Sequence, residues 1–214
     1  MTEKSVLLLL VLLFFFLPSE GCRSKPPARQ DYLAETLHYR SMVDSFFRYD
    51  PQSPFHQDTA VQYHGLNWYP PDPEFTFSSK LYRYNTPAAV SIYGTKGEER
   101  KMIRYGYFLI DYDGRQYVLN IYKRAPQDPQ HPGRDNEPLS VWFTDETTGQ
   151  ETYGVGRYID IGEEQPDPNF SYTINFNNAY NPYCAYSSRY SCAIPMKEDH
   201  LPFPVHAGEK KYHP

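Results

Sequence analysis

The clearest pattern along the chain is the alternation of apolar and polar residues in two neighbouring stretches. Met102–Tyr112 and Gln116–Tyr122 both alternate and are rich in aromatic and branched residues, and the pair Asp113-Gly114 stands between them. A period of two is typical of a strand with one buried face. Asp-Gly suits a two-residue hairpin turn, because both turn positions take positive φ. The sequence therefore predicts a β-hairpin.

Six further stretches have the length and residue types of short strands. They are Phe75–Phe77, Leu81–Tyr84, Ala89–Tyr93, Leu139–Phe143, Glu151–Ile161 and Phe170–Phe176. Turn signals separate them, such as Thr147-Thr148-Gly149, and residues 125–138 form a Pro-rich stretch that predicts an exposed loop. Short strands with frequent turns predict a mainly β fold, an antiparallel sandwich or barrel.

One stretch near the beginning of the chain has a helical period instead. Between Asp31 and Tyr49 the apolar residues recur about every 3.6 positions, with Asp31 suited to the N-cap and Pro51 to the end of the helix. The apolar positions are Leu33, Leu37, Met42, Val43, Phe46 and Phe47. We expect one N-terminal amphipathic helix that packs this face onto the domain.

The first residues have the layout of a secretory signal. Lys4 precedes an uninterrupted apolar run, Val6–Leu17, which is shorter than the roughly 20 residues that span a bilayer. Gly21-Cys22 then resembles the lipobox of bacterial lipoproteins, in which the Cys becomes the first residue and carries the lipid. The alternative is an ordinary cleaved signal with a chance Cys. Both interpretations place the rest of the chain outside the cytoplasm.

The expected organisation follows from this layout. Residues 1–21 would be a lipoprotein-type signal peptide, residues 22–30 a polar, Pro-rich tether, and residues 31–214 a single domain. Lipidated Cys22 would anchor the exported protein to a bacterial membrane, facing the periplasm or the exterior.

Composition supports one domain and excludes some partners. With 40% hydrophobic residues, the chain of 214 residues can bury one sizeable core, and 21 Tyr with 20 Pro favour strands and stiff loops over a helical bundle. A formal net charge of −5 without clustered Lys or Arg argues against nucleic acid as a partner. No phosphate-binding glycine loop, G-x-S-x-G or H-E-x-x-H motif occurs, so we expect no cofactor and assign no catalytic residues.

The chain has three cysteines. If Cys22 carries the lipid, Cys184 and Cys192 remain as a pair, and in an oxidising compartment we expect a disulfide that stabilises the fold by roughly 2.5 kcal/mol. With His200 and His206 the same cysteines form a formal zinc-type series, ranked lower because structural zinc sites bring ligand pairs closer together. A nucleophilic Cys184 activated by a nearby histidine ranks last.

The stretch Asn175–Cys192 is the strongest candidate for a site, because Tyr, Asn and Cys crowd together there without a regular apolar period. Asn178 and Asn181 are turn formers, and a scaffolding role alone explains them. The alternative is that these amides, with the hydroxyls of Tyr180 and Tyr186, hold a polar ligand.

Three charged residues lie on one expected strand. Alternation would place Glu151 and Arg157 on the same face and Asp160 on the opposite one. These residues either form cross-strand ion pairs or, in the functional interpretation, Arg157 clamps an anion or a carboxylate.

Three blocks together resemble a known family. They are F-T-D-E-T-T-G-Q-E-T-Y-G-V-G-R-Y-I-D at 143–160, N-F-N-N-A-Y-N-P-Y-C-A-Y at 175–186 and A-G-E-K at 207–210. They are similar to the signature blocks of the DUF1684 family, with the densest match from Leu139 to Lys210. Asn175 departs from the Asp that is common there. The resemblance implies that the blocks form one site, which adds Glu209 and Lys210 to the candidates, and it implies no reaction.

Two functional hypotheses follow. The first is a cell-envelope lipoprotein whose β-rich domain is a binding or structural module for a small polar ligand or an envelope component. The alternative is an enzyme, for example a hydrolase, that uses the 151–158 strand and the 177–186 loop.

Overall fold

The structure is a computed structural model that describes residues 29–124 and 138–213. The expected signal peptide, Cys22 and nearly all of the tether lie outside the described residues, as does the expected loop at 125–137. Within the described ranges, no helix combines the length and apolarity that crossing a bilayer requires.

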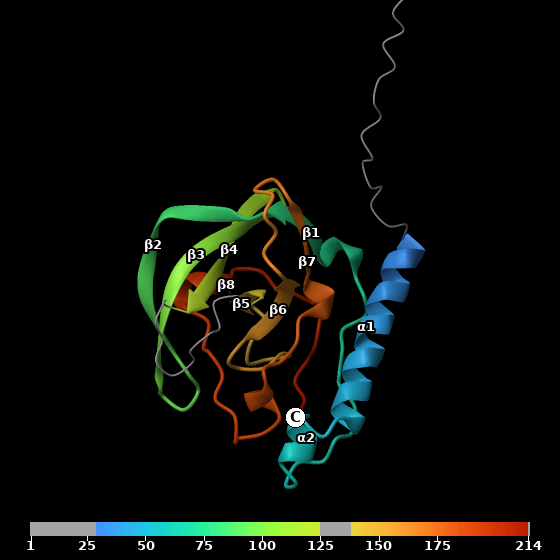
Figure 1. The fold of residues 1–214 in the computed structure, drawn as a ribbon. Coiled ribbons are helices and arrows are strands. Elements are labelled where there is room, and N and C mark those ends of the chain that lie inside the picture. Colours follow the sequence, from blue (N-terminus) through green and yellow to red (C-terminus); the bar gives the residue numbers. More distant parts are fainter. Residues whose placement is uncertain (1–28, 125–137, 214) are drawn as a thin grey trace, which may run out of the picture.

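Antiparallel sheets dominate the fold, which confirms the mainly β prediction (Figure 1). The larger sheet runs β2 (Tyr82–Tyr93), β3 (Glu99–Tyr112), β4 (Arg115–Arg124), β5 (Leu139–Asp145) and β6 (Arg157–Gly162), and β8 (His200–Leu201) pairs with β5 in parallel. The smaller sheet pairs β1 (Thr76–Lys80) with β7 (Ser171–Asn175). The described strands do not close into a barrel.

The predicted hairpin is confirmed. Strands β3 and β4 pair up to Tyr112 and Arg115, and Asp113 and Gly114 take φ values of 49° and 70°, as a two-residue turn with two positive φ angles requires. The two strands expected at 81–84 and 89–93 are one strand, β2, whose register shifts between Arg83 and Ala88.

The strand expected at Glu151–Ile161 is wrong in its first half. Only Arg157–Gly162 is a strand, and the chain before it folds into a tight turn in which the Thr147 carbonyl accepts hydrogen bonds from the N–H groups of residues 150, 151 and 152. Gly156 ends this turn with a φ of 115°, which disfavours any residue with a side chain. Glu151 and Arg157 therefore do not share a strand face.

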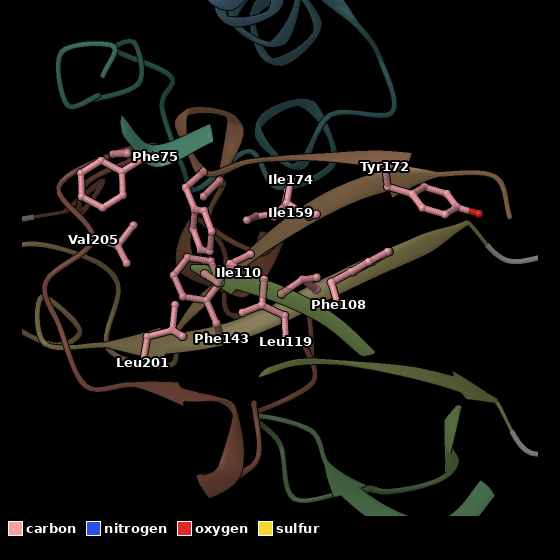
Figure 2. Packing of buried hydrophobic residues seen from close by; sticks show 14 of the residues in the cluster. Phe75, Phe108, Ile110, Leu119, Phe143, Ile159, Tyr172, Ile174, Leu201 and Val205 are labelled. Carbon is pink, nitrogen blue, oxygen red and sulfur yellow. The ribbon is translucent and has the colours of Figure 1, made fainter. Parts of the chain in front are cut away.

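Both sheets and the C-terminal segment enclose one apolar core. Figure 2 shows Phe108, Ile110 and Leu119 from the β3–β4 hairpin, Ile174 from β7, and Leu201 and Val205 from the C-terminal segment among its side chains. Val205 and Ile174 are completely buried. The C-terminal segment is thus a structural part of the core, and the last blocks of the family signature lie beside it.

Helix α1 (Arg29–Tyr49) is present and begins before Asp31, but the predicted face is partly wrong. Leu33, Leu37 and Met42 are exposed by 44%, 51% and 59%. The inward face instead carries Tyr32, Thr36, Arg40, Val43 and Phe47. The Arg40 guanidinium makes this possible, because it donates to the carbonyls of Tyr69 and Asn177 at 2.8 and 3.1 Å.

Helix α1 runs along one side of the β structure, and the short helix α2 (Pro54–Gln57) and the end of the chain lie near its C-terminal end (Figure 1). Phe47 and Phe55 from the two helices pack with Tyr186 and Tyr212 in a second apolar cluster. This cluster fixes the C-terminal end of α1 against the loop that precedes Cys192.

Candidate functional site

Strand β6 separates the charged residues of the first signature block onto two faces. Arg157 and Ile159 point inward and are each 1% exposed, whereas Tyr158 is partly exposed and Asp160 is exposed. Strand β5 has the same alternation, with Phe143 and Asp145 inward and Trp142 outward. The two faces carry two distinct groups of polar residues, which we call the inner network and the outer groove.

Arg157 is the centre of the inner network. Its Nη2 donates to Asp145 Oδ2 and to the Val205 carbonyl, both at 2.9 Å, and its Nη1 donates to the carbonyls of Ala207 and of Glu209, the latter at 3.2 Å. Both side chains of the Arg157–Asp145 ion pair are 1% exposed. A buried charge is tolerated when it is paired and hydrogen-bonded in this way.

Glu209 forms the other half of the inner network. Its carboxylate accepts hydrogen bonds from the Tyr186 hydroxyl at 2.7 and 2.8 Å and from the Asn181 N–H at 3.0 Å. Burial raises the pKa of Glu209 to about 7, against the opposing effect of these hydrogen bonds and of the Arg157 charge. The Asn181 side chain donates to the Lys210 carbonyl at 2.8 Å.

The inner network fastens the C-terminal segment to β6 and to the 175–186 block. Gly208, with a φ of 79°, explains why the A-G-E-K block contains glycine, since a Cβ there would lie 2.6 Å from the Ala179 carbonyl oxygen and 2.7 Å from that of Phe176. Four of the residues predicted to bind ligand belong to this network, namely Arg157, Asn181, Tyr186 and Glu209. Each is buried and hydrogen-bonded to other protein groups, so these four residues stabilise the fold in this structure.

The outer groove is a hollow of about 600 Å³ between α1, the outward face of β5 and β6, and the loop at 180–193. Its wall on α1 includes Tyr39, Met42 and Phe46. The remaining lining is mostly aromatic and consists of Trp142, Tyr158, Tyr180, Tyr183 and Tyr190, together with Val43, Phe47, Arg100, Asp160, Pro182, Ser191, Cys192 and Ala193. A hollow of this size, apolar with a few polar groups, is the usual form of a small-molecule site.

Among the described residues that line the groove, Asp160 is the only carboxylate. The Tyr180 hydroxyl donates to its Oδ1 at 2.9 Å. The surrounding protein atoms raise the pKa of Asp160 by desolvation, and the hydrogen bond from Tyr180 opposes that rise. Among the described residues, no Lys, Arg or His forms an ion pair with it. Its charge is therefore not balanced by the described part of the chain.

The rings of the groove pack against one another in tilted and edge-on pairs. Trp142 and Tyr158, which are paired across β5 and β6, have ring centroids 5.5 Å apart, and Tyr158 meets Tyr180 edge-on at 5.9 Å. Tyr183 and Tyr190 form a second edge-on pair at 5.2 Å. Arg100 also lines the groove, and its guanidinium donates to Glu98 at 2.7 Å and to the Ser191 carbonyl at 2.8 Å.

The other predicted ligand residues lie in neither group. Glu151 lines a separate hollow with His206, 3.5 Å away, and Lys210 lies 3.7 Å from the Glu151 carboxylate. Asn178 is half-buried, and its backbone carbonyl accepts a hydrogen bond from the Tyr39 hydroxyl at 3.4 Å. Of the eight predicted residues, Tyr180 alone lines the outer groove.

The two late cysteines are free thiols in the structure, so the expected disulfide is not formed in it. They are nevertheless neighbours, because the Cys184 N–H donates to Cys192 Sγ at 3.2 Å. Hydrogen bonds from the Cys192 thiol and the Tyr153 hydroxyl lower the pKa of Cys184. The lower-ranked zinc interpretation is not supported, since no metal-binding group of three His, Cys, Asp or Glu occurs within the described ranges.

The histidines are bonded elsewhere. His200 contacts Thr144 and Glu146 at 3.1 and 3.2 Å, and His206 lies beside Glu151. Neither histidine is among the groove residues. The nucleophile interpretation required a histidine beside Cys184, and the side-chain partners found for Cys184 are Cys192, Tyr153 and Thr95.

Sequence reasoning missed most of the groove. It placed Asp160 on the face opposite Arg157, which is correct. It did not identify the residues that surround Asp160 on that face. Trp142 could have been found from the sequence, because pairing two alternating strands at 139–143 and 157–161 sets it beside Tyr158. The predicted apolar face of α1 already contained Met42, Val43, Phe46 and Phe47, which line the groove, but the sequence did not indicate which strands this face lies against.

Comparisons with known proteins identify the family of the chain and a protein of similar structure. The family described as "Protein of unknown function (DUF1684)" matches residues 61–210. A solution NMR structure of an uncharacterised protein from Haloarcula marismortui is similar, with 29% sequence identity and a TM-score of 0.58, over 85% of this chain and 95% of that one. A search of curated proteins finds no match. The match to more than half of its residues shows that the chain belongs to the DUF1684 family.

Proposed function

We propose that the protein is a binding module whose ligand occupies the outer groove between α1 and strands β5 and β6. The observation that carries this proposal is Asp160, an exposed carboxylate with one neutral hydrogen bond in an aromatic hollow. The inner network offers no comparable place, because its polar side chains are bonded to other protein groups and are out of reach of solvent.

The lining of the groove supports a ligand with a sizeable apolar body and a polar group. Aromatic side chains bind flat or apolar surfaces, and a single polar group in such a site fixes orientation. Tyr180 and Asp160 supply that polar group from two different signature blocks. The ligand of the proposal is thus amphipathic, whereas the sequence alone suggested a small polar one.

The enzyme alternative has less support. Its two proposed segments place Arg157, Asn181 and Tyr186 in the inner network, away from the outer groove. Within the lining of the groove no histidine stands beside a hydroxyl or thiol, which is the arrangement that activates most nucleophiles.

A titration followed by NMR tests the binding proposal. Small aromatic and aliphatic fragments are added to the isotope-labelled protein, and we expect them to shift the backbone amide signals of residues 158–160 and 180–183. Trp142→Ala should remove these shifts, whereas Tyr93→Ala, which removes an aromatic ring 53% exposed outside the groove, should leave them unchanged. Shifts confined to the hollow around Glu151 and His206 would show that the groove is not the site.

We further propose that the protein is exported and lipid-anchored, so that the ligand is a small molecule or an envelope component. The support is the apolar run Val6–Leu17 followed by Gly21-Cys22. If Cys22→Ser leaves the protein in the membrane fraction, the lipid anchor is wrong. In an oxidising compartment the neighbouring Cys184 and Cys192 should pair, which would show as a difference of about 2 Da in intact mass on reduction.

A further inference from the structure

We infer that the ligand of the outer groove carries a positive charge and is an organic ammonium compound with an apolar or aromatic body. This inference rests on the proposed function, because it names the chemical class of the same ligand. Three observations carry it: the unpaired charge of Asp160, the rings around it, and the neutralised state of the cation in the groove.

Asp160 differs from the ion-paired carboxylates Asp145 and Glu164, and also from the buried Asp199, whose two oxygens are both occupied by neutral donors, namely Asn120, Tyr122 and the Met196 N–H. Asp145 is paired with Arg157, and Glu164 accepts hydrogen bonds from Arg83, Lys123 and Tyr105. Asp160 has the Tyr180 hydroxyl on Oδ1 and no described partner on Oδ2. A carboxylate in a partly desolvated site is stabilised most by a cation, which is the partner that this chain does not supply within its described residues.

The rings nearest to Asp160 suit the same cation. Tyr39, Tyr180 and Tyr183 line the same groove as Asp160, and the Tyr180 hydroxyl is hydrogen-bonded to it. Burial and the negative charge of Asp160 raise the pKa of each phenol, so the rings stay neutral. The faces of neutral aromatic rings attract ammonium groups, and an adjacent carboxylate strengthens that attraction.

Arg100 does not reverse this preference. Its guanidinium is already bonded to the Glu98 carboxylate and to the Ser191 carbonyl, so its positive charge is balanced before any ligand enters. An anionic ligand would meet Asp160 and a ring of electron-rich faces. The groove of about 600 Å³ leaves room for a drug-sized apolar body beside the ammonium group.

Three matched probes test the charge preference. 2-Phenylethylamine, 2-phenylethanol and phenylacetate have the same ring and differ in the charge of the end group, which is positive, neutral or negative at pH 7. Calorimetric titration of the full protein should show the amine binding about 10-fold more tightly than the alcohol, with no binding of the acid. Groove amide shifts, measured by NMR for each probe, locate the binding.

Two variants connect the preference to Asp160. Asp160→Asn should weaken binding of the amine by about 10-fold and leave binding of the alcohol unchanged, because the amide retains the size and the hydrogen bond of the carboxylate but not its charge. Asp111→Asn removes an exposed carboxylate in the β3–β4 hairpin and should change neither affinity. Circular dichroism serves as the check that both variants are folded.

The outcomes separate the two proposals. If the alcohol shifts the groove amides and binds as tightly as the amine, or if Asp160→Asn binds the amine like the wild type, the cation inference is overturned and the proposed groove remains. If the three probes leave the groove amides unshifted at millimolar concentrations, both proposals are contradicted.

Discussion

The inner network and the outer groove both include residues of strand β6, but they differ in whether a charged side chain has a partner of opposite charge. In the inner network the ion pair of Arg157 and Asp145 is surrounded by hydrogen bonds to three backbone carbonyls. In the outer groove Asp160 has a single neutral partner. Arg157 and Asp160 are close in one signature block but can have different roles, because alternation along β6 places them on different faces of the strand.

The difference shows how a family signature is to be interpreted. The fold requires three residues of the signature. Arg157 and Glu209 hold the C-terminal segment by hydrogen bonds, and Gly208 permits its close approach to the 175–186 block. Asp160 is not demanded by the fold, because the surrounding protein disfavours its charge. A polar residue that the fold does not need is the better indication of binding.

The largest expected effect comes from breaking the inner ion pair. Arg157→Ala leaves the Asp145 carboxylate buried without its cation and three carbonyls without a donor, so we expect the free energy of unfolding to fall by about 3–5 kcal/mol. Urea titration followed by circular dichroism measures it. Arg48→Ala removes an exposed arginine that pairs with Asp44 and should cost at most about 0.5 kcal/mol.

Equal losses in these two arginine variants would show that the inner network contributes no more than a surface pair. The comparison between the two faces would then lose its basis, and Arg157 would again be a candidate for ligand contact.

An intermediate effect is expected in the pH dependence of stability. The pKa of Glu209 is about 7 in the folded protein and near its ordinary 4.5 when unfolded, so between these values the folded state holds a proton that the unfolded state has lost. The contribution of protonated Glu209 to the free energy of unfolding is fully present below pH 4.5. It is lost as the pH rises to 7, at about 1.4 kcal/mol per pH unit.

Glu209→Gln isolates this contribution, because glutamine does not titrate. Wild type should lose roughly 3 kcal/mol relative to the variant between pH 4.5 and pH 7, measured by urea unfolding at several pH values. Parallel pH profiles for the two proteins would mean that Glu209 is ionised at low pH in the fold, contrary to its buried position.

The smallest effect is expected on the outer face. Asp160→Asn should change the free energy of unfolding at pH 7 by no more than about 0.5 kcal/mol. We expect the variant to be slightly more stable, because the raised pKa of Asp160 means that the fold disfavours the ionised carboxyl. Asp145→Asn, the same chemical change in the inner network, should cost several times more, because Arg157 would lose its counter-charge. Thermal unfolding of both variants under one buffer gives the contrast directly.

Local signals predicted the parts of the fold that local forces determine. The β3–β4 hairpin followed from alternation and from Asp113-Gly114, which the turn itself requires. The inward face of α1 followed only in part, with Val43 and Phe47, because a buried arginine contradicts any apolar pattern. Arg40 is acceptable inside only through carbonyls of Tyr69 and Asn177, and these partners are distant in the sequence.

The candidate site was predictable to a similar extent. The blocks at 143–160 and 175–186 do come together, as the bridge between Tyr158 and Tyr180 shows. Their division into two faces was hidden by the misplaced start of β6, which put Glu151 beside Arg157. The true partner, Asp145, accepts hydrogen bonds from the Thr147 N–H and hydroxyl, in a turn that the alternation pattern does not reveal.

The dependence of Arg157 on the carbonyls of Val205, Ala207 and Glu209 also sets the order of events during synthesis. A nascent chain that has reached β6 cannot yet enclose this arginine, since the groups that solvate it are translated about 50 residues later. The core therefore cannot be completed until the C-terminal segment has been synthesised, because Leu201, Val205 and Ala207 are part of it.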